Sequence, residues 1–547
     1  MSSKGGGATV NLHSKDIQPD VGNGMPARLS RRSYAITLFL MLLVCFGYFM
    51  PKWADWGANS RANLVYAFGD QGVLYIDDYH ENTGDKACFP GPYDLETNIC
   101  VGHYYTDKSL GPSLVALPFY LVFKGIAALP PVERFIQSGQ SIGSFSDTLN
   151  PEGQGIRPEA VYQGMALTFM TFFAMGIPSA LLGVTVFLFA ARFSRRDADA
   201  FILALAYSLA TIAYPYSNAL IQHQLAAFGA FVGFFLLWRV IREQADHRWL
   251  WAVGVLFGLT AITEYPVVPF LGILFVWAVI VMPDRLALYR VVLGALPLGL
   301  IFAAYNYAAF NTPLPVGYEY STLWQTEHQT GFLSLTAPSL ERLYGLTFSP
   351  VRGIFLISPF LLLAFPGFVQ MWRQADRRDV ALVIALICAG FLLYNASSVM
   401  WWGGFTIGPR YLVPMLPFLV LPIIFPLNRL LERRWGQALV VLLVAISLFS
   451  VWTMTLGGQA WPPVDEWPIT FNQMNAHSPL FDYSLPLLAR GDIARNYGIL
   501  FGLRGFASLI PLLVALAAIL LIVPRGLSRW EARRSAGTLK PAAGSAD

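Results

Sequence analysis

Long apolar runs, separated by short polar segments, follow one another along nearly the whole chain. A helix needs about 20 apolar residues to cross the hydrocarbon of a bilayer. Runs of roughly this length cover 33–50, 161–191, 199–216, 219–239, 249–264, 266–282, 290–310, 353–372, 380–397, 411–427, 437–456 and 506–524. Only 13% of the residues are charged, whereas about a quarter is usual in soluble proteins. The pattern predicts an all-α polytopic membrane protein with about 12–13 transmembrane helices.

The two ends of the chain differ from this apolar body. Residues 1–30 are rich in Gly, Ser and Asn, which is typical of a disordered tail. The apolar run that follows could pass for a signal peptide, but it leads into Pro51, Lys52 and Trp53 rather than a small-residue cleavage site. We therefore expect a first transmembrane helix, a transmembrane domain over 31–526, and cytoplasmic tails at 1–30 and 527–547.

Arginine-rich loops set the expected sidedness, because positive charge in short loops marks the cytoplasm. These clusters lie at 28–32, 192–196, 239–248, 285–290, 373–378, 429–434 and 525–534. Placing them all inside makes the long first loop 51–112 non-cytoplasmic, together with 311–352 and 457–505. The net charge of +4 is spread over these loops, so it reflects topology and not a nucleic-acid surface.

One further apolar run, 113–130, leaves two arrangements open. Either it does not cross alone and is re-entrant or interfacial, or it crosses and the long run 161–191 is broken near Gly176-Ile177-Pro178. The alternation of the twelve other spans requires that 113–130 does not cross alone, and both arrangements stay open.

The first loop carries the acids that could do chemistry. Asp55, in W-A-D-W-G-A-N-S-R, lies just after the first span, where a carboxylate could act as a general base. Position alone favours a solvated loop acid over a catalytic base. Asp77 and Asp78 are adjacent in Y-I-D-D-Y-H-E; they suit a divalent cation or a wet turn, and spacing alone favours the turn.

Other polar residues fall on the same expected side. Asp107 and Lys108 end the segment G-H-Y-Y-T-D-K, which also contains His103 and Tyr105. Lys108 either contacts a phosphate or snorkels at a helix end. Ionisable residues at span ends are functional candidates or helix-end hydrogen-bonding groups; those on this side are His223, Glu264 and Arg410.

Cys88 and Cys100 are the only cysteines in a polar loop. Because external compartments are oxidising, we expect a disulfide between them. The sequence has no Walker A loop, dinucleotide-binding glycine motif, HExxH or nucleophile elbow. The missing Walker A loop argues against a protein driven by hydrolysis of cytoplasmic ATP.

One span, an acidic outer loop with an early Asp, the motif Y-Y-T-D-K-S-L-G-P and many later spans together resemble the GT-C superfamily of membrane glycosyltransferases. Within it, the chain is similar to the branch of aminoarabinose transferases and protein O-mannosyltransferases. The resemblance covers roughly residues 33–430. Its specific motifs lie in 53–113, with a weaker one at 400–411, and D-K-S-L-G-P stands where many relatives have Lys-Pro-Pro.

This resemblance implies a GT-C-like fold with a long first non-cytoplasmic loop, and transfer of a sugar from a polyprenyl-phosphate donor. The acceptor would belong to the cell envelope of a bacterium, with the active site facing outside and inversion at the anomeric carbon. Asp55 would be the catalytic base, with Asp77 and Asp78 as competitors for that role. Lys108 and Arg410 would contact the donor phosphate, and Asp107 would orient the site or hold Mg²⁺ or Mn²⁺.

The runner-up from a different class is a transporter or flippase for a lipid-linked glycan. It would share the spans and a polar outer cavity. Alternating access, however, predicts polar groups near the middle of the membrane rather than on one face.

Overall fold

The computed structural model describes residues 29–50, 55–94, 96–97, 99–139, 161–323, 327, 330–331, 334–404, 406–458 and 470–538. Nearly all of the predicted N-terminal tail and the last nine residues, 539–547, lie outside this part of the chain. The helix α25 (Ile510–Thr538) extends beyond the expected start of the C-terminal tail at 527.

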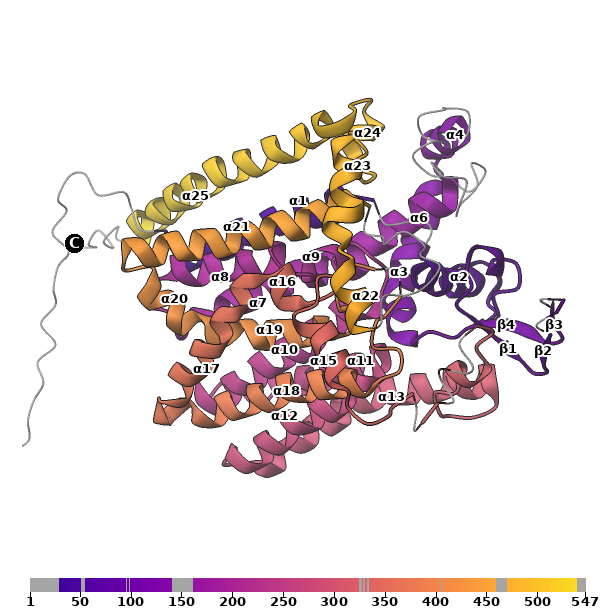
Figure 1. The fold of residues 1–547 in the computed structure, drawn as a ribbon, viewed down its shortest axis with the longest axis horizontal. Coiled ribbons are helices and arrows are strands. Elements are labelled where there is room, and N and C mark those ends of the chain that lie inside the picture. Colours follow the sequence, from indigo (N-terminus) through magenta and orange to yellow (C-terminus); the bar gives the residue numbers. More distant parts are fainter. Residues whose placement is uncertain are drawn as a thin grey trace, which may run out of the picture.

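Helices form almost all of the described structure (Figure 1). Nine of the described helical segments are long and apolar enough to cross a membrane: Arg31–Tyr48 (α1), Leu110–Ala127 (α3), Val161–Ala190 (α6 Val161–Thr171, a π-helical turn Phe172–Gly176, α7 Ile177–Ala190), Gln222–Arg242 (α10), Arg285–Phe310 (with α13 Tyr289–Phe310), Ala375–Ser397 (with α18 Arg378–Ser397), Arg410–Leu430 (with α19 Leu416–Val420 and α20 Ile424–Leu430), Arg434–Leu456 (α21) and Gly505–Glu531 (within α25). Three shorter apolar helical segments are Trp249–Thr263 (α11), Tyr265–Val281 (with α12 Val268–Val281) and Pro359–Trp372 (with α17 Ala364–Trp372). The predicted all-α polytopic membrane fold is confirmed.

The remaining described elements are short. The helices are α2 Trp56–Gln71, α4 Pro130–Gly139, α8 Asp197–Leu209, α9 Ala213–Tyr216, α15 Leu340–Thr347, α16 Ile354–Ile357, α22 Phe471–Ala476, α23 Leu485–Ala489 and α24 Tyr497–Leu500. The strands are β1 Lys86–Phe89, β2 Tyr93–Asp94, β3 Ile99–Cys100 and β4 His103–Thr106. Short 3₁₀ or π turns are η1 His80–Asn82, η6 Gly317–Tyr320 and η11 Pro479–Ser484.

One expected span, 199–216, is two short helices, α8 and α9, that are separated at Ala210–Ile212. The α8 helix has 13 residues, which is roughly 20 Å at 1.5 Å per residue. Thr211 explains the break, because its hydroxyl donates to Tyr207 O (2.7 Å) and accepts from Ala213 N (3.1 Å). A side chain that bonds the local backbone in this way competes with the helix ladder.

The run 161–191 is a single helical segment of 30 residues. It contains the π-helical turn Phe172–Gly176 directly before Pro178. Proline has no N–H to donate to the carbonyl four residues earlier, so the backbone widens there without breaking. The expected alternative of a broken helix in this run is wrong.

The ambiguous run 113–130 corresponds to α3, which packs along α2. Near its start, Ser113 Oγ donates to Arg61 O (3.0 Å), and near its end Lys124 Nζ donates to Asp70 Oδ1 (2.9 Å). Arg61 and Asp70 both belong to α2. Both ends of α3 therefore lie beside α2, and the two helices run side by side in the same direction.

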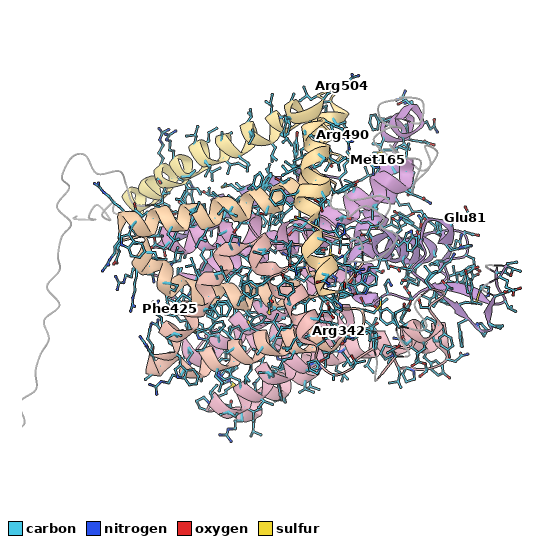
Figure 2. All side chains as sticks on the ribbon, viewed as in Figure 1. Glu81, Met165, Arg342, Phe425, Arg490 and Arg504 are labelled. Atoms are coloured by element: carbon cyan, nitrogen blue, oxygen red, sulfur yellow. A yellow bond between two sulfur atoms is a disulfide. The ribbon has the colours of Figure 1, made fainter. Side chains whose placement is uncertain are left out.

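Arginine-rich loops meet at one end of the helix bundle, which we call the basic end. Ion pairs join loops that are far apart in the sequence: Arg31–Asp197, Arg192–Glu243, Arg195–Glu432 and Arg242–Asp379. The strands and α2 lie at the opposite end, to the right in Figure 1, which we call the site end. Figure 2 shows Phe425 and Glu81 near these two ends.

Close packing of α10, α11 and α13 brings their ends together at the site end. A Cβ atom on Gly229 of α10 would lie 2.2 Å from Thr260 Oγ1 of α11, and one on Gly254 of α11 would lie 2.3 Å from Val291 O of α13. Glycine at such contacts lets neighbouring helix backbones approach closely. The start of α10 and the ends of α11 and α13 all contribute side chains to the site.

Candidate functional site

The hairpin of β1 and β4 positions two carboxylates around one ammonium. The strands are antiparallel, and Lys86 pairs with Thr106 at the open end of the hairpin. The next residue on each side is Asp85 and Asp107. Lys108 Nζ lies 3.3 Å from Asp85 Oδ1 and 3.1 Å from Asp107 Oδ1.

This charge cluster is largely shielded from solvent. The side chains of Lys108 and Asp85 are 13% and 14% exposed, and that of Asp107 is 0% exposed. Burial raises the pKa of Asp107, against the attraction of Lys108. Burial alone would lower the pKa of Lys108, but the charges of Asp107 and Asp85 outweigh it and raise the pKa above its ordinary value. Lys108 is therefore a firmly charged cation.

The loop 311–352 closes over this cluster by pairing with β1. Ala87 and Ser321 form an antiparallel bridge, and Thr322 N donates to Lys86 O (2.9 Å). Ser321 Oγ then donates to Asp107 Oδ2 (2.9 Å). The same turn places the Tyr318 ring 5.5 Å from Lys108 Nζ.

Asp55 caps the N-terminus of α2, where its Oδ1 accepts a hydrogen bond from Ala58 N (2.9 Å). The first turn of α2 joins it to the Lys108 cluster. A Cβ atom on Gly57 would lie 3.3 Å from Asp55 Oδ1, 3.3 Å from an Arg61 nitrogen and 3.5 Å from Asp85 Oδ2. The Asp55 and Asp85 carboxylates therefore border the same small space.

Arg61 is a fully buried cation on the inner face of α2. Its guanidinium donates to Gly57 O (2.5 Å) and to the Gln222 amide oxygen at the start of α10. Burial lowers its pKa, while the neighbouring charge of Asp85 opposes this. The buried Nε has no hydrogen-bond partner among the described residues.

Arg410 directly follows a glycine-rich loop, and this loop folds around a second buried cation, Arg352. Arg352 donates to the carbonyls of Gly404, Thr406 (3.3 Å) and Gly408 (3.1 Å). Gly404 and Gly408 have φ of 81° and 61°, in the left-handed region that favours glycine. Burial lowers the pKa of Arg352 to about 10.

The side chain of Arg410 faces the charges of α2. It interacts electrostatically with Asp55 and with Arg61. Its guanidinium lies 5.3 Å from the centre of the Tyr411 ring, and its buried Nε has no hydrogen-bond partner among the described residues. An arginine with an unused Nε–H donor suits an anionic ligand.

His223 and Glu264 form a buried pair next to these arginines. His223 Nδ1 lies 2.9 Å from Glu264 Oε1, and the two side chains are 0% and 6% exposed. His223 Nε2 and Glu264 Oε2 have no hydrogen-bond partner among the described residues. The pair joins the start of α10 to the end of α11, directly after Gln222, the partner of Arg61.

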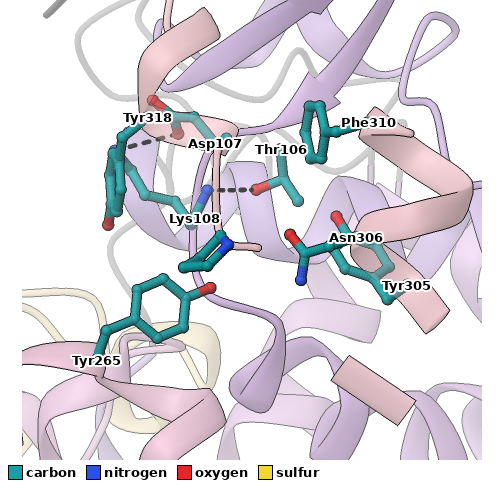
Figure 3. Close-up of a pocket in the computed structure, with 10 residues that line it drawn as sticks. Thr106, Asp107, Lys108, Tyr265, Tyr305, Asn306, Phe310 and Tyr318 are labelled. Carbon is teal, nitrogen blue, oxygen red and sulfur yellow. Dashed lines mark hydrogen bonds and ion pairs between the residues drawn. The ribbon is translucent and has the colours of Figure 1, made fainter. Parts of the chain in front are cut away.

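A small pocket opens beside Lys108 (Figure 3). It is lined by Thr106, Asp107, Lys108, Tyr265, Tyr305, Asn306, Phe310, Pro315, Gly317 and Tyr318. These residues come from the hairpin, the end of α13, the start of the α12 segment and the 311–352 loop. Tyr105, on β4, packs its ring against Phe310 (5.3 Å between centroids) behind the pocket wall.

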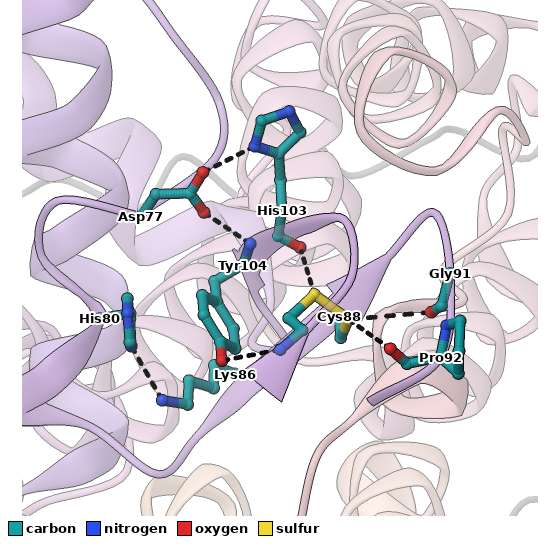
Figure 4. The surroundings of a disulfide bond; sticks show 9 residues. Asp77, His80, Lys86, Cys88, Gly91, Pro92, His103 and Tyr104 are labelled. Carbon is teal, nitrogen blue, oxygen red and sulfur yellow. Dashed lines mark hydrogen bonds and ion pairs between the residues drawn. A yellow bond between two sulfur atoms is a disulfide. The ribbon is translucent and has the colours of Figure 1, made fainter. Parts of the chain in front are cut away.

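The adjacent acids Asp77 and Asp78 make contacts of their own away from Lys108. Asp77 lies 2.6 Å from His103 Nδ1 and accepts from Tyr104 N (2.7 Å), which fastens the segment before η1 to β4 (Figure 4). Asp78 accepts from Gln71 Nε2 (2.6 Å) on the exposed surface. Asp77 and Asp78 therefore make the local contacts that are typical of a turn at the edge of the site.

The predicted disulfide between Cys88 and Cys100 is confirmed, with a Cα–Cα distance of 5.6 Å (Figure 4). It joins β1 to β3 and so ties the tip of the β1–β4 hairpin to the small β2–β3 pair.

The two carboxylates nearest to the expected metal position at Asp107 both contact Lys108. Among the residues that the structure describes, no group of three or more His, Cys, Asp or Glu side chains could hold a metal ion. Asp85 and Asp107 both contact the ammonium of Lys108, which thus occupies the position between two carboxylates that a cation would take.

Sequence reasoning did not single out Arg61, Asp85, Arg352 or Tyr318 as site residues. One signal was available: Arg61 and Arg352 are arginines in segments assigned to the non-cytoplasmic side, where arginine is depleted. Nothing local marks Asp85 or Tyr318, because their roles depend on strand pairing.

The described part of the chain is thus a multi-pass membrane protein with a charged site at one end of its bundle. No protein-family model matches the sequence, and no curated protein sequence matches it. Among solved structures, the chain is similar to the crystal structure of ArnT from Cupriavidus metallidurans bound to undecaprenyl phosphate. The alignment has a TM-score of 0.44 and 13% sequence identity, and covers 90% of this chain and 72% of that one.

Proposed function

We propose that this protein is a membrane glycosyltransferase that moves a sugar from a polyprenyl-phosphate donor to an acceptor of the cell envelope. The observation that carries the proposal is the cluster in which Lys108, Arg61 and Arg410 converge with the Asp55 carboxylate at one end of the bundle. A lipid phosphate needs cations at the membrane surface, and an acceptor hydroxyl needs a base. The motifs around Asp55 and Lys108 that resemble the GT-C superfamily point the same way.

In the proposed reaction, Asp55 takes the proton of the acceptor hydroxyl while the acceptor oxygen attacks the anomeric carbon of the sugar. The bond from that carbon to the phosphate oxygen breaks, and its electron pair leaves with the polyprenyl phosphate. Lys108 and Arg410 stabilise the negative charge that develops there. Attack opposite the leaving group inverts the anomeric centre.

The reaction belongs on the non-cytoplasmic face in this proposal. The basic end of the bundle corresponds to the cytoplasm by the distribution of arginine. The β1–β4 hairpin and α2, whose residues make up most of the charge cluster, lie at the other end. A polyprenyl chain would extend into the bilayer from a phosphate held at that surface, and no nucleotide site is needed.

The transporter reading predicts a different distribution of polar groups. Alternating access around a central site needs polar groups near the middle of the bundle. The buried charges described above instead join the ends of α10, α11 and α13 to the first loop. This favours chemistry at one surface.

The direct test is to incubate the purified protein in nanodiscs with radiolabelled polyprenyl-phosphate sugars and a membrane extract as the source of acceptors. We expect labelled product together with release of polyprenyl phosphate. Movement of labelled donor across proteoliposome membranes without any transfer would contradict the proposal and support a flippase.

Asp55 provides the sharpest variant. Asn caps a helix about as well as Asp, so Asp55→Asn should leave α2 intact while removing the base. We expect transfer to fall by about 10²–10⁴-fold, with thermal unfolding unchanged. Asp284→Asn is the matched control, because Asp284 also caps a helical turn (3.4 Å to Ala287 N) but lies outside the site. Equal transfer activities of the Asp55→Asn and Asp284→Asn variants would rule out Asp55 as the base.

A further inference from the structure

Arg61 and Lys108 differ in the partners that surround their charges. Lys108 contacts two carboxylates. Arg61 is 1% exposed, yet its guanidinium donates to two neutral oxygens, Gly57 O (2.5 Å) and the side-chain oxygen of Gln222. A buried cation is costly to keep unless other groups compensate its charge. Among the described residues, the charge of Arg61 is therefore hydrogen-bonded without being neutralised by a directly bonded carboxylate.

The residue type at position 222 is what leaves this charge in place. The Gln222 amide oxygen accepts from Arg61, as a carboxylate oxygen would, but it adds no negative charge. A glutamate of the same length would form an ion pair with Arg61 and cancel its charge. The amide thus orients the guanidinium and leaves its charge available to an anion.

The first turn of α10 holds Gln222 in place. His223, the next residue, lies with its Nδ1 2.9 Å from Glu264 Oε1 at the end of α11. Gln224 then donates its Nε2 to Ser217 Oγ (3.3 Å), directly after α9. The side chains of His223 and Gln224 are buried. Gln222 therefore extends toward α2 from a backbone that two buried hydrogen bonds fix to other elements.

Arg61 also keeps a donor for a ligand. Its buried Nε has no hydrogen-bond partner among the described residues. The same guanidinium interacts electrostatically with Lys108 and with Arg410. Like charges repel one another, so an anion placed near these three cations lowers the energy of all of them.

We propose that Gln222 is a positioning residue for the donor phosphate. It acts through Arg61, whose guanidinium it orients and leaves charged, so that Arg61 binds the phosphate of the polyprenyl donor. The His223–Glu264 pair acts one step further away, by holding the first turn of α10. The inference rests on the proposed function, because Arg61 belongs to the cluster that is assigned to this phosphate.

Gln222→Glu separates this role from a purely structural contact. The variant keeps the length of the side chain and an oxygen that accepts from Arg61, so a structural role predicts unchanged ligand binding. The proposal predicts that undecaprenyl phosphate binds at least about tenfold more weakly, because the new carboxylate neutralises Arg61 and repels the phosphate. The Kd is measured with the purified full chain in nanodiscs. Thermal unfolding should show that the variant is as stable as the wild type.

Gln137→Glu is the matched control, because it adds the same charge on the exposed surface of α4. Its Kd should equal that of the wild type, and equal Kd values for Gln222→Glu and Gln137→Glu would overturn the proposal. If Gln222→Glu does not fold, Gln222→Met removes the acceptor without adding charge. We then expect a Kd at least about twofold higher than in the wild type, and an unchanged Kd would overturn the proposal.

Undecaprenol, which lacks the phosphate, is the reference ligand. Equal binding of the alcohol and the phosphate by the wild type would overturn the proposed function, and the role of Gln222 with it. If the wild type prefers the phosphate and Gln222→Glu keeps that preference in full, the role of Gln222 alone is overturned.

Discussion

At the scale of single residues, the site depends on one ammonium held between two carboxylates. Asp107 is fully buried and Lys108 nearly so. Removal of one partner from a buried ion pair leaves an uncompensated charge, which costs far more than the intact pair contributes. In the proposed mechanism Lys108 therefore affects both stability and phosphate binding, and a single substitution cannot separate these roles.

Paired substitutions separate them. We expect Lys108→Gln to lower the free energy of unfolding by about 3–5 kcal/mol and to abolish transfer. Asp107→Asn/Lys108→Gln removes the charge of the fully buried carboxylate together with the ammonium and leaves only the partly exposed Asp85, so it should recover part of the stability but none of the activity. Lys124→Gln is the control, since its pair with Asp70 is half-exposed and is worth at most about 1 kcal/mol. Thermal unfolding in detergent and transfer assays measure both effects, and restored transfer in the double variant would contradict the role of Lys108.

Removal of divalent cations gives a second prediction at this scale. Because the ammonium of Lys108 lies between Asp85 and Asp107, we expect transfer to continue in EDTA at the rate seen with added Mg²⁺ or Mn²⁺. The measurement is the initial rate across a titration of chelator. A loss of activity that only one metal restores would show that a cation takes part.

At the scale of elements, the β1–β4 hairpin is the frame of the site. Its register brings Asp85 opposite Asp107, and the bridge from Ala87 to Ser321 brings in the loop with Tyr318. The disulfide and the contacts of Asp77 hold the same hairpin at its sides. A more mobile hairpin should therefore change the positions of Asp85 and Asp107 relative to Lys108.

The disulfide tests this relation. We expect Cys88→Ser/Cys100→Ser to destabilise the hairpin by about 2–4 kcal/mol and to raise KM for the donor several-fold without abolishing transfer, because Asp77 still binds Tyr104. Hydrogen exchange should show faster exchange over 86–106 and no change in the helix bundle. Unchanged exchange in that segment would contradict the proposal that the disulfide stabilises the hairpin.

At the scale of the whole molecule, charge separates the two ends of the bundle. Arginine pairs hold the loops of the basic end together, while the hairpin, α2 and α3 gather at the other. α3 is long and apolar enough to cross a membrane, yet it packs along α2 at both of its ends. The position of α4, directly after α3, therefore decides the topology.

Cysteine labelling of intact cells measures this. We expect Asp492→Cys and Gln137→Cys to react with an impermeant reagent, and Asp376→Cys to react only after permeabilisation. Asp492 and Asp376 have side chains that are 63% and 74% exposed, and the free cysteines of the described residues, Cys45 and Cys388, are buried. Protection of Gln137→Cys from the reagent would mean that α3 crosses the membrane. Protection of Asp492→Cys would mean that the predicted sidedness of the whole chain is wrong.

Properties that depend on neighbours in the chain were accessible without a structure. The apolar runs predicted the spanning helices, because a bilayer demands a long stretch of apolar residues whatever lies beside it. The disulfide was accessible too, since Cys88 and Cys100 share one loop. The run 199–216 was predicted as one helix and is two, because a local bond from Thr211 interrupts the helix, and hydropathy does not register such a bond.

Relations between distant segments were decided by tertiary packing. Lys108, Asp55 and Arg410 were candidates by residue type, but the partnership of Lys108 with Asp85 depends on strand register, and that of Arg61 with Gln222 depends on how α2 packs on α10. The lining of the pocket beside Lys108 likewise joins the β1–β4 hairpin to the end of α13. Hydropathy gives each helix its length and composition, whereas the energy of a buried charge depends on which groups surround it in space, and only the packed bundle determines those.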